Sequence, residues 1–251
     1  MIELDGAVCL ITGAGGAIGS ATAERIVACG GRVVLHDSNE PAVRRTADRL
    51  GSAARVFVGD LGNMKHIESL WSECLGAHGQ IDVLINNAGV YPAAPLSADL
   101  EDWVRAWDFS LRVNLLAPAV LCRAAILYFS DRETGGIIIN MASRAAFRGE
   151  DPDYWSYAAA KAGIVAMTKT LARQYGRQGV TAFAIAPGYV DTDFNAPFRD
   201  QFGVEAAARD TGLGEVAQPS DIANVVAFLA SGLARHATGA TIDVNGASYV
   251  R

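Results

Sequence analysis

Two side chains able to move a proton lie four residues apart in the run Tyr157-Ala158-Ala159-Ala160-Lys161. Residues spaced i and i+4 share one face of a helix, so the phenol and the ammonium are expected to be neighbours. A phenol with a pKa near ~10 is a poor general base, but a cation about 5 Å away would stabilise the phenolate by roughly 3 kcal/mol. Taken alone, the pair is better explained as a surface cation over an aromatic ring.

A glycine-rich turn could bind a phosphate group. The run Thr12-Gly13-Ala14-Gly15-Gly16-Ala17-Ile18-Gly19 follows a short apolar segment and precedes a helix-like one. Glycines there let the backbone approach a pyrophosphate, whose charge is stabilised by free N–H groups and the helix dipole. The spacing fits T-G-x-x-x-[GA]-x-G rather than G-x-G-x-x-G. Such a turn is often only a turn, but its place between strand and helix predicts a dinucleotide site.

Asp37 ends the second predicted strand, about 20 residues beyond the glycine loop, where a carboxylate can contact a ribose. It would accept hydrogen bonds from both ribose hydroxyls of NAD and repel the 2′-phosphate of NADP. The glycine loop and Ser38-Asn39 carry no Arg or Lys that would neutralise this phosphate. The alternative is that Asp37 caps the next turn. The spacing favours NAD(H) as the cofactor.

The elements that would position these residues alternate along the chain. Runs such as VCLI and IIIN lack polar alternation, which suits strands buried on both faces of a parallel sheet. Regular alternation of strand and helix predicts a doubly wound, Rossmann-like α/β fold with seven parallel strands in a single domain, 1–251. The expected strands are Ala7–Thr12, Arg32–His36, Arg55–Gly59, Asp82–Asn86, Gly136–Met141, Val180–Ala186 and Thr241–Val244; the expected helices are Ala17–Cys29, Pro41–Gly51, Asn63–His78, Glu101–Ser130, Trp155–Tyr175 and Pro219–Ser231.

Composition excludes several classes of protein. The chain has 251 residues, of which 51% are hydrophobic and 19% charged, so it has ample apolar material for a core. Its net charge of −6 is unlike that of a protein that binds nucleic acid or an anionic membrane surface. Its four cysteines show no paired spacing and indicate reduced thiols in a cytoplasmic protein. The acidic start does not resemble a signal peptide, and apolar stretches such as Leu115–Leu121 are shorter than a membrane span. The four histidines show no metal-ligand spacing and are expected at surfaces or helix ends, so no metal is predicted.

Taken together, these features resemble the short-chain dehydrogenase/reductase family in its compact, non-extended branch. The resemblance runs from Leu4 to about Gly246 and follows the family's order. The matching segments are the glycine loop, Asp60-Leu61, Asn86-Asn87-Ala88-Gly89, Asn114, Ser143, Tyr157 with Lys161, and Pro187-Gly188 followed by Thr192.

The resemblance implies catalytic roles for four residues. Tyr157 would exchange the alcohol proton while hydride moves to or from the nicotinamide. Ser143 would donate a hydrogen bond to the substrate oxygen, as an oxyanion-hole donor does. Lys161 would lower the Tyr157 pKa and hold the nicotinamide ribose, and Asn114 would anchor a water joining Lys161 to solvent. Considered singly, Ser143 and Asn114 also suit cap or turn positions.

The same resemblance implies a set of contacts to the cofactor. Asp60 would bind the adenine amino group, Asn87 would line the adenosine ribose side, and Thr192 would donate to the nicotinamide carboxamide. The residues expected to contact NAD are Gly13, Gly15, Gly16, Ile18, Gly19, Asp37, Asp60, Leu61, Asn87, Ala88, Gly89, Tyr157, Lys161, Pro187, Gly188, Val190 and Thr192.

The chain departs from the family pattern beside the expected active site. Ala17 replaces a common glycine, and the interval from Ser143 to Tyr157 is one residue longer than usual, within a charged and aromatic loop. Charged residues on this rim suggest a small polar alcohol or ketone such as a polyol, sugar or hydroxy acid, although they could equally solvate a loop. The expected substrate contacts are Ser143, Arg144, Arg148, Trp155, Tyr157 and Tyr189.

Two further expectations concern the segment 192–213 and the assembly. The segment breaks the alternation beyond a strand end, which suggests an irregular lid over the substrate rather than an ordinary surface excursion. Trp103 and Trp107 lie four apart and are expected to pack a core or a subunit face. The helices of Asn114 and Tyr157 and the tail Thr241–Arg251 resemble the family's subunit contacts, which implies a homotetramer.

Three functions are compatible with these observations. The first is an NAD-dependent dehydrogenase using Tyr157, Lys161, Ser143 and Asn114. The second is an NADPH-dependent reductase of 3-oxoacyl thioesters, against which Asp37 argues. The third is a non-catalytic nucleotide sensor, which would be expected to have lost the tyrosine or the lysine.

Overall fold

Seven parallel strands form a single sheet in the computed structural model, which describes residues 2–251. The strand order is β3-β2-β1-β4-β5-β6-β7, so the order reverses between β1 and β4, as in doubly wound folds. The Rossmann-like fold expected from the alternation is confirmed. The strands are β1 (Val8–Thr12), β2 (Arg32–Asp37), β3 (Ala54–Val58), β4 (Val83–Asn86), β5 (Gly136–Met141), β6 (Val180–Pro187) and β7 (Thr241–Val244).

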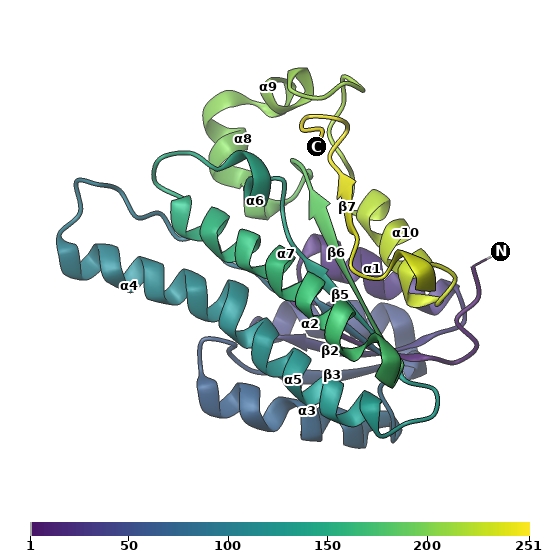
Figure 1. The fold of residues 1–251 in the computed structure, drawn as a ribbon. Helices are drawn as coiled ribbons and strands as arrows, with labels where there is room; N and C mark the ends of the chain where they lie inside the picture. The colour runs from purple at the N-terminus through teal and green to yellow at the C-terminus, as the bar shows by residue number, and fades with distance from the viewer. Residues whose placement is uncertain (1) are drawn as a thin grey trace.

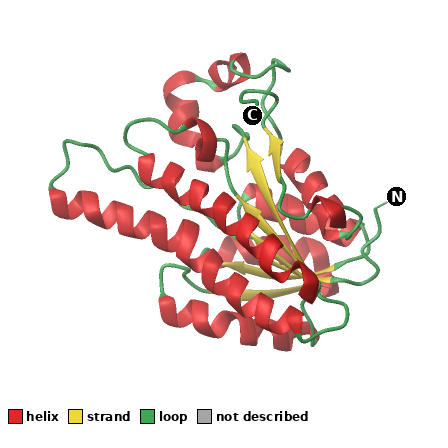
Figure 2. Ribbon diagram, viewed as in Figure 1, coloured by secondary structure: helices red, strands yellow, loops and turns green. Residues whose placement is uncertain are grey.

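Helices cover both faces of this sheet (Figure 1). A core cluster on one face contains side chains of α3, α5 and α7, and a second cluster on the other face contains those of α1, α2 and α10. Figure 2 shows the resulting three layers, with the strands between two sets of helices. The long helices are α1 (Ala17–Ala28), α2 (Glu40–Leu50), α3 (Met64–His78), α4 (Leu100–Leu111), α5 (Ala117–Ser130), α7 (Trp155–Tyr175) and α10 (Pro219–Ala230).

Short polar side chains fix where several helices begin. Asn63 accepts a hydrogen bond from the Lys65 amide before α3, and Asp99 accepts one from the Asp102 amide before α4. Before α10, Gln218 and Asp221 form a reciprocal capping box, and Pro219 occupies the first turn. These caps satisfy backbone donors that have no partner within the helix.

The helix expected over Glu101–Ser130 is interrupted. Residues Arg112–Leu116 form a π-helical turn between α4 and α5. Within that turn Asn114 bonds the backbone of Val90 with both ends of its amide, so the local geometry serves a tertiary contact. Such turns inside α-helices are frequent at functional sites.

The segment 192–213, expected to be irregular, contains two short helices. They are α8 (Ala196–Phe202) and α9 (Val204–Arg209), separated by Gly203, whose φ of +76° favours glycine. A further short helix that was not predicted, α6 (Ala145–Arg148), follows β5. Figure 1 shows α6, α8 and α9 grouped beyond the carboxyl ends of β5, β6 and β7.

The stretch Leu100–Ser130 is long and apolar enough to cross a membrane by length and composition. It packs beside α3 and α7 instead, and half of its most apolar window is buried. The exposed half includes Val104, Phe109, Leu116 and Leu127. A core helix with one uncovered apolar side explains the composition.

Candidate active site

A cleft of about 720 Å³ lies beyond the carboxyl ends of the strands. Every residue that the sequence analysis expected to contact NAD lines it, as do five of the six expected substrate contacts. The cleft therefore joins the glycine loop, the end of β2 and the Tyr157–Lys161 pair in a single space. This is the position in which doubly wound folds bind their ligands.

The glycine loop is packed so closely that three of its glycines, Gly13, Gly15 and Gly19, have no room for a side chain. A Cβ on Gly13 would lie 2.8 Å from Cα of Ala88, and one on Gly19 would lie 2.2 Å from the Gly13 carbonyl oxygen. Asn87 holds the loop by donating from Nδ2 to the carbonyl oxygens of Thr12 and Gly13, at 2.9 and 3.1 Å. Its amide is thus used within the protein, behind the position that the resemblance implies for the adenosine.

Gly16 begins α1 and faces the cleft, where a Cβ would meet nothing closer than 3.4 Å. Since a glycine has no side chain to cap the helix, the first N–H groups of α1 remain for a ligand. These donors and the positive end of the helix dipole suit an anionic group such as a pyrophosphate. The loop therefore fits the cofactor that its sequence predicts.

Asp37 is held at the edge of the loop by two backbone donors. Its Oδ2 accepts from the Gly15 amide and its Oδ1 from the Asn39 amide, both at 2.8 Å. The side chain of Arg45, on α2, lines the same cleft. This cation was not predicted, because Arg45 lies eight residues beyond Asp37 in the chain and reaches the cleft only through the packing of α2.

An unexpected pair of histidines lies at the end of β2, where His36 lines the cleft. His36, expected at a surface, is buried in β2, and its Nε2 lies 2.9 Å from Nε2 of His66. Burial, and next the nearby His66, lower the pKa of His36 to about 4, so this ring is neutral at physiological pH. Asp60 lies close by and accepts from the Gly62 amide at 2.7 Å. These contacts shape the wall that the resemblance assigns to adenine.

Lys161 reaches the cleft from α7 with a buried ammonium. Its Nζ donates to the Met141 carbonyl oxygen at 2.8 Å and lies 5.5 Å from the ring centroid of Tyr157. Burial lowers the pKa of Lys161 to about 8. The tyrosine and the lysine are thus on one helix face, as their spacing predicted, but inside the protein rather than on its surface.

Tyr157 is buried as well, and burial is the main influence on its acidity. Burial raises the pKa of the Tyr157 phenol, a hydrogen bond from Ser143 lowers it, and the nearby Glu150 raises it further. The sequence analysis expected Lys161 to lower this pKa. In the structure desolvation outweighs the charge effects, because the whole pair is withdrawn from water.

Asn114 does not line the cleft, although it lies next to it. Its Oδ1 accepts from the Val90 amide at 3.0 Å, and its Nδ2 donates to the Val90 carbonyl oxygen at 2.9 Å. A Cβ on Gly89 would lie 3.1 Å from that Oδ1 and 3.8 Å from Nζ of Lys161. Asn114 and Lys161 therefore approach each other across Gly89, and any side chain there would separate them.

Aromatic rings surround the Tyr157 phenol, and most of them were not predicted from the sequence. Tyr91 stacks on Tyr154 with centroids 3.9 Å apart and meets the Tyr157 ring edge-on at 4.9 Å. Phe194, from the 192–213 segment, lies 5.6 Å from Tyr91. Tyr154 belongs to the charged and aromatic loop between Ser143 and Tyr157 that the sequence had pointed to. Nothing in the sequence indicated that Tyr91 would stack on it.

Trp155, expected to contact substrate, is not among the residues that line the cleft. Its ring packs against Trp103 and Trp107 of α4, at 5.7 and 5.9 Å between centroids. As the first residue of α7 it points to the neighbouring helix, while Tyr157, two residues later, points to the cleft. Trp103 and Trp107, which were expected to pack a core or a subunit face, lie 5.2 Å apart between ring centroids in this cluster.

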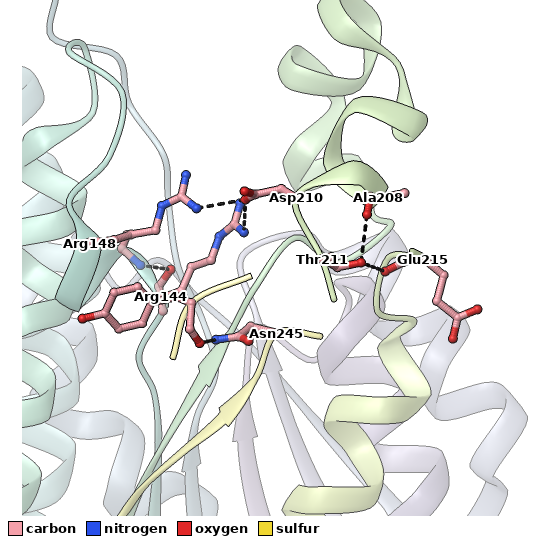
Figure 3. Close-up of polar contacts among 10 residues, drawn as sticks. Arg144, Arg148, Ala208, Asp210, Thr211, Glu215 and Asn245 are labelled. Carbon is pink, nitrogen blue, oxygen red and sulfur yellow. Dashed lines mark hydrogen bonds and ion pairs between the residues drawn. The ribbon is translucent and has the colours of Figure 1, made fainter. Parts of the chain in front are cut away.

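The rim of the cleft carries two arginines joined to one carboxylate. Nη1 of Arg144 and of Arg148 donate to Oδ2 of Asp210, at 2.7 and 2.9 Å (Figure 3). Burial alone would raise the pKa of Asp210, but the hydrogen bond from Arg148 and the two positive charges keep it below its usual value. Tyr189, the remaining expected substrate contact, also lines the cleft.

Comparison with known proteins agrees with this arrangement. A family model described as enoyl-(acyl carrier protein) reductase matches residues 13–247. The chain belongs to the short-chain dehydrogenase/reductase family. Membership in this family makes it an oxidoreductase that acts on an alcohol or ketone group and uses a nicotinamide dinucleotide.

Relatives within the short-chain dehydrogenase/reductase family differ in their substrates. A 3β-hydroxysteroid dehydrogenase of Eggerthella lenta is 36% identical over 250 residues, covering 97% of this chain and 94% of that protein. A 3-oxoacyl-[acyl-carrier-protein] reductase of Rickettsia felis is 34% identical over 246 residues, covering 98% of each. The crystal structure of a 3-ketoacyl-(acyl-carrier-protein) reductase from Brucella melitensis, in complex with NADH, superposes with a TM-score of 0.90 at 28% identity, covering 99% of this chain and 100% of that one.

Proposed function

We propose that the chain transfers a hydride between NAD(H) and a secondary alcohol or ketone, with a small polar compound such as a polyol, sugar or hydroxy acid as substrate. The observation that carries the choice of coenzyme is Asp37, whose carboxylate lies at the end of β2 beside Gly15. A carboxylate in that position accepts from ribose hydroxyls and repels a 2′-phosphate. The charged rim formed by Arg144, Arg148 and Glu150 supports a polar substrate.

The residues of the cleft divide the chemistry among them. The bound nicotinamide supplies or accepts the hydride. Tyr157 gives a proton to the carbonyl oxygen in reduction and takes it back in oxidation, and Ser143 donates a hydrogen bond to the same oxygen. Because burial raises the Tyr157 pKa, the phenol is protonated near neutral pH, which suits reduction. Lys161 carries the nearest positive charge, and below its pKa of about 8 it stabilises any phenolate that forms.

The second candidate is an NADPH-dependent reductase of 3-oxoacyl thioesters. Two observations favour it: relatives with that substrate in their names, and the cation of Arg45 beside the cleft, which could pair with a 2′-phosphate. A non-catalytic sensor is disfavoured, because Tyr157, Lys161 and Ser143 are all present and converge in the cleft.

The decisive experiment compares coenzymes in the wild type and two variants. We would first screen polyols, sugars and hydroxy acids with NAD, and acetoacetyl thioesters with NADPH. With NAD as coenzyme, Asp37→Ala should lower kcat/KM about tenfold or more, the loss expected for a charge-assisted hydrogen bond, and should improve the use of NADP. Arg45→Gln should leave the NAD reaction unchanged.

The opposite pattern would select the reductase of thioesters. In that case Arg45→Gln would reduce activity with NADPH, and Asp37→Ala would not affect it. Tyr157→Phe is the control for both, because losing the general acid should lower turnover about 100-fold with either coenzyme. If Tyr157→Phe turns over substrate as fast as the wild type, Tyr157 is not the general acid.

We extend the proposal to organisation and location. The chain would work as one NAD-binding domain over 1–251, with 192–213 as a lid, in a cytoplasmic homotetramer. The lid is supported by the pairing of Val190 with Ala217, which brings the two ends of the excursion together. The location is supported by the four cysteines, all free thiols. Nothing in the family relationship suggests a nucleic-acid or membrane partner.

A further inference from the structure

The two rim arginines share a single partner. Arg144 immediately precedes α6 and Arg148 ends it, and both pair with Asp210, which follows α9 in the lid (Figure 3). Among the residues that the structure describes, neither arginine pairs with any other carboxylate within 4.0 Å. Two positive charges therefore meet one negative charge, and a guanidinium fork has donors for more than one acceptor.

Burial separates Arg144 from the other two side chains of this contact. The Arg144 side chain is 18% exposed, whereas those of Arg148 and Asp210 are 39% and 46% exposed. A charge that is largely removed from water needs a counter-ion, whereas a half-exposed carboxylate returns to solvent at little cost. If Asp210 moves away with the lid, Arg144 therefore requires another anion, and Arg148 adds a second positive charge beside it.

The position of the pair points to the substrate. Arg144 directly follows Ser143, and its amide donates to the Pro187 carbonyl oxygen at 3.0 Å, which fixes it beside the catalytic residues. Arg144 and Arg148 both line the cleft that contains Tyr157. Glu150 also lines it, but burial raises the pKa of that carboxyl, which weakens it as a permanent partner.

The lid does not depend on the arginines for its attachment. Backbone contacts hold its two ends: the Gly212 amide donates to the Gly246 carbonyl oxygen at 2.6 Å, and the Asp191 amide donates to that of Ala217 at 3.1 Å. Thr211 adds two hydrogen bonds within the same stretch, to carbonyl oxygens on either side of it (Figure 3). A purely mechanical role for the ion pair would duplicate these contacts.

We propose that Arg144 and Arg148 form a subsite for the carboxylate of a hydroxy-acid or keto-acid substrate, and that Asp210 is a resident ligand which this carboxylate replaces. The inference rests on the proposed dehydrogenase function and narrows its substrate class. A carboxylate held here would leave the neighbouring carbinol carbon near Ser143 and Tyr157. Paired guanidinium groups suit this task because they bind a carboxylate through charge-assisted hydrogen bonds.

The test uses matched acids and amides with NAD: lactate and lactamide, 3-hydroxybutyrate and 3-hydroxybutyramide, gluconate and gluconamide. For at least one pair, the wild type should use the acid about tenfold or more better than the amide in kcat/KM. Arg144→Gln and Arg148→Gln should remove that preference, because each should lower kcat/KM for the acid about tenfold more than kcat/KM for the amide. Asp210→Asn should lower KM for the acid and not for the amide, because it removes the competing carboxylate.

A mechanical role predicts a different pattern. If Asp210 and the arginines only brace the lid, all three variants will slow the acid and the amide equally, and the proposal is then wrong. It is also wrong if the wild type oxidises other alcohols and none of these acids. The matched control is Arg105→Gln on α4, which removes an exposed arginine that pairs with Glu101 and does not line the cleft, and which should change kcat/KM for neither the acid nor the amide.

Binding separates this proposal from the dehydrogenase proposal. Should the wild type oxidise no alcohol, the proposed function fails, and calorimetry with the same three acids on the NADH-bound protein decides the subsite by itself. Binding to the wild type with loss in the Arg144→Gln/Arg148→Gln double variant supports the subsite. Equal binding to both proteins, or none to the wild type, overturns it.

Discussion

The burial of Lys161 could not be seen in the sequence, and it changes the expected protonation of this residue. In the sequence it is a cation one helical turn from a phenol. In the structure it is 4% exposed, with its Nζ on the Met141 carbonyl oxygen. Burial of an ammonium disfavours its charged form, which lowers the Lys161 pKa to about 8 and makes the folded protein sensitive to its protonation.

This burial predicts a pH-dependent stability. The folded pKa of about 8 lies below the unfolded value of about 10.4. Between the two, the unfolded chain binds more protons, so the free energy of unfolding should rise with pH in this window. Lys161→Met should be more stable than the wild type by on the order of 3 kcal/mol below pH 8, with the difference vanishing towards pH 10.5.

Urea unfolding of the coenzyme-free protein at several pH values measures this effect. The exposed Lys169→Met variant, on the same helix, is the control and should follow the wild type at every pH. Parallel stability curves for the wild type and Lys161→Met between pH 8 and 10.5 would show that the ammonium is not desolvated. The Lys161→Met variant should also have lost most of its activity, because the charge beside Tyr157 is gone.

At the scale of elements, the glycine loop separates the needs of folding from the needs of binding. Gly19 lies inside α1 against the backbone of Gly13, so its missing side chain is a packing requirement. Gly16 begins the same helix with φ of −75°, which any residue can adopt, and it faces the cleft. One glycine therefore serves the fold and the other serves the ligand.

Two alanine substitutions test this division. Gly19→Ala should destabilise the protein by about 1–3 kcal/mol, because the new Cβ overlaps the Gly13 carbonyl oxygen. Gly16→Ala should change the stability by less than about 1 kcal/mol and weaken NADH binding about tenfold, because the methyl group occupies the cleft. Urea unfolding and fluorescence titration with NADH measure the two effects. If Gly19→Ala is as stable as the wild type, the packing role of Gly19 is wrong. If Gly16→Ala binds NADH as tightly as the wild type, the ligand-binding role of Gly16 is wrong.

For the whole molecule, the uncovered side of α4 and α5 is the feature that a single chain does not explain. Leu116 is 44% exposed and Leu127 is 56% exposed, on the continuous helical stretch Leu100–Ser130 that also carries the exposed Val104 and Phe109. Large apolar side chains that stay exposed on neighbouring helices commonly mark a contact between proteins. The uncovered side coincides with one of the helices that the family resemblance assigns to subunit contacts, which supports the proposed homotetramer.

Light scattering at micromolar concentration should give the mass of four chains for the wild type. Leu116→Glu and Leu127→Glu should shift the protein to smaller species, since each places a charge in the apolar contact. Leu213→Glu, at an exposed position in the lid, is the control and should not change the mass. A single-chain mass for the wild type would rule out the tetramer.

The parallel sheet, the order of its elements and the residues of the glycine loop were predictable from the sequence, and so were about half of the residues that line the cleft. They were predictable because these features depend on local patterns: apolar strands without alternation, glycines between strand and helix, and a tyrosine and a lysine at i and i+4. Asp37 was found from its spacing, whereas the Tyr157–Lys161 pair was interpreted as catalytic only together with the other motifs of the family. The π turn that breaks the helix around Asn114 was missed, since the contact with Val90 that holds it spans distant parts of the chain.

The burial of individual polar groups and the contacts between residues far apart in the chain follow from tertiary packing and could not be predicted from the sequence. The buried phenol, the neutral His36 and the contact of Arg144 and Arg148 with Asp210 all depend on elements far apart in the chain. The packing of Trp155 against α4 and the position of Arg45 at the cleft depend in the same way on contacts between separate elements. Desolvation and pairing of charges are properties of the packed interior, and no local pattern encodes them.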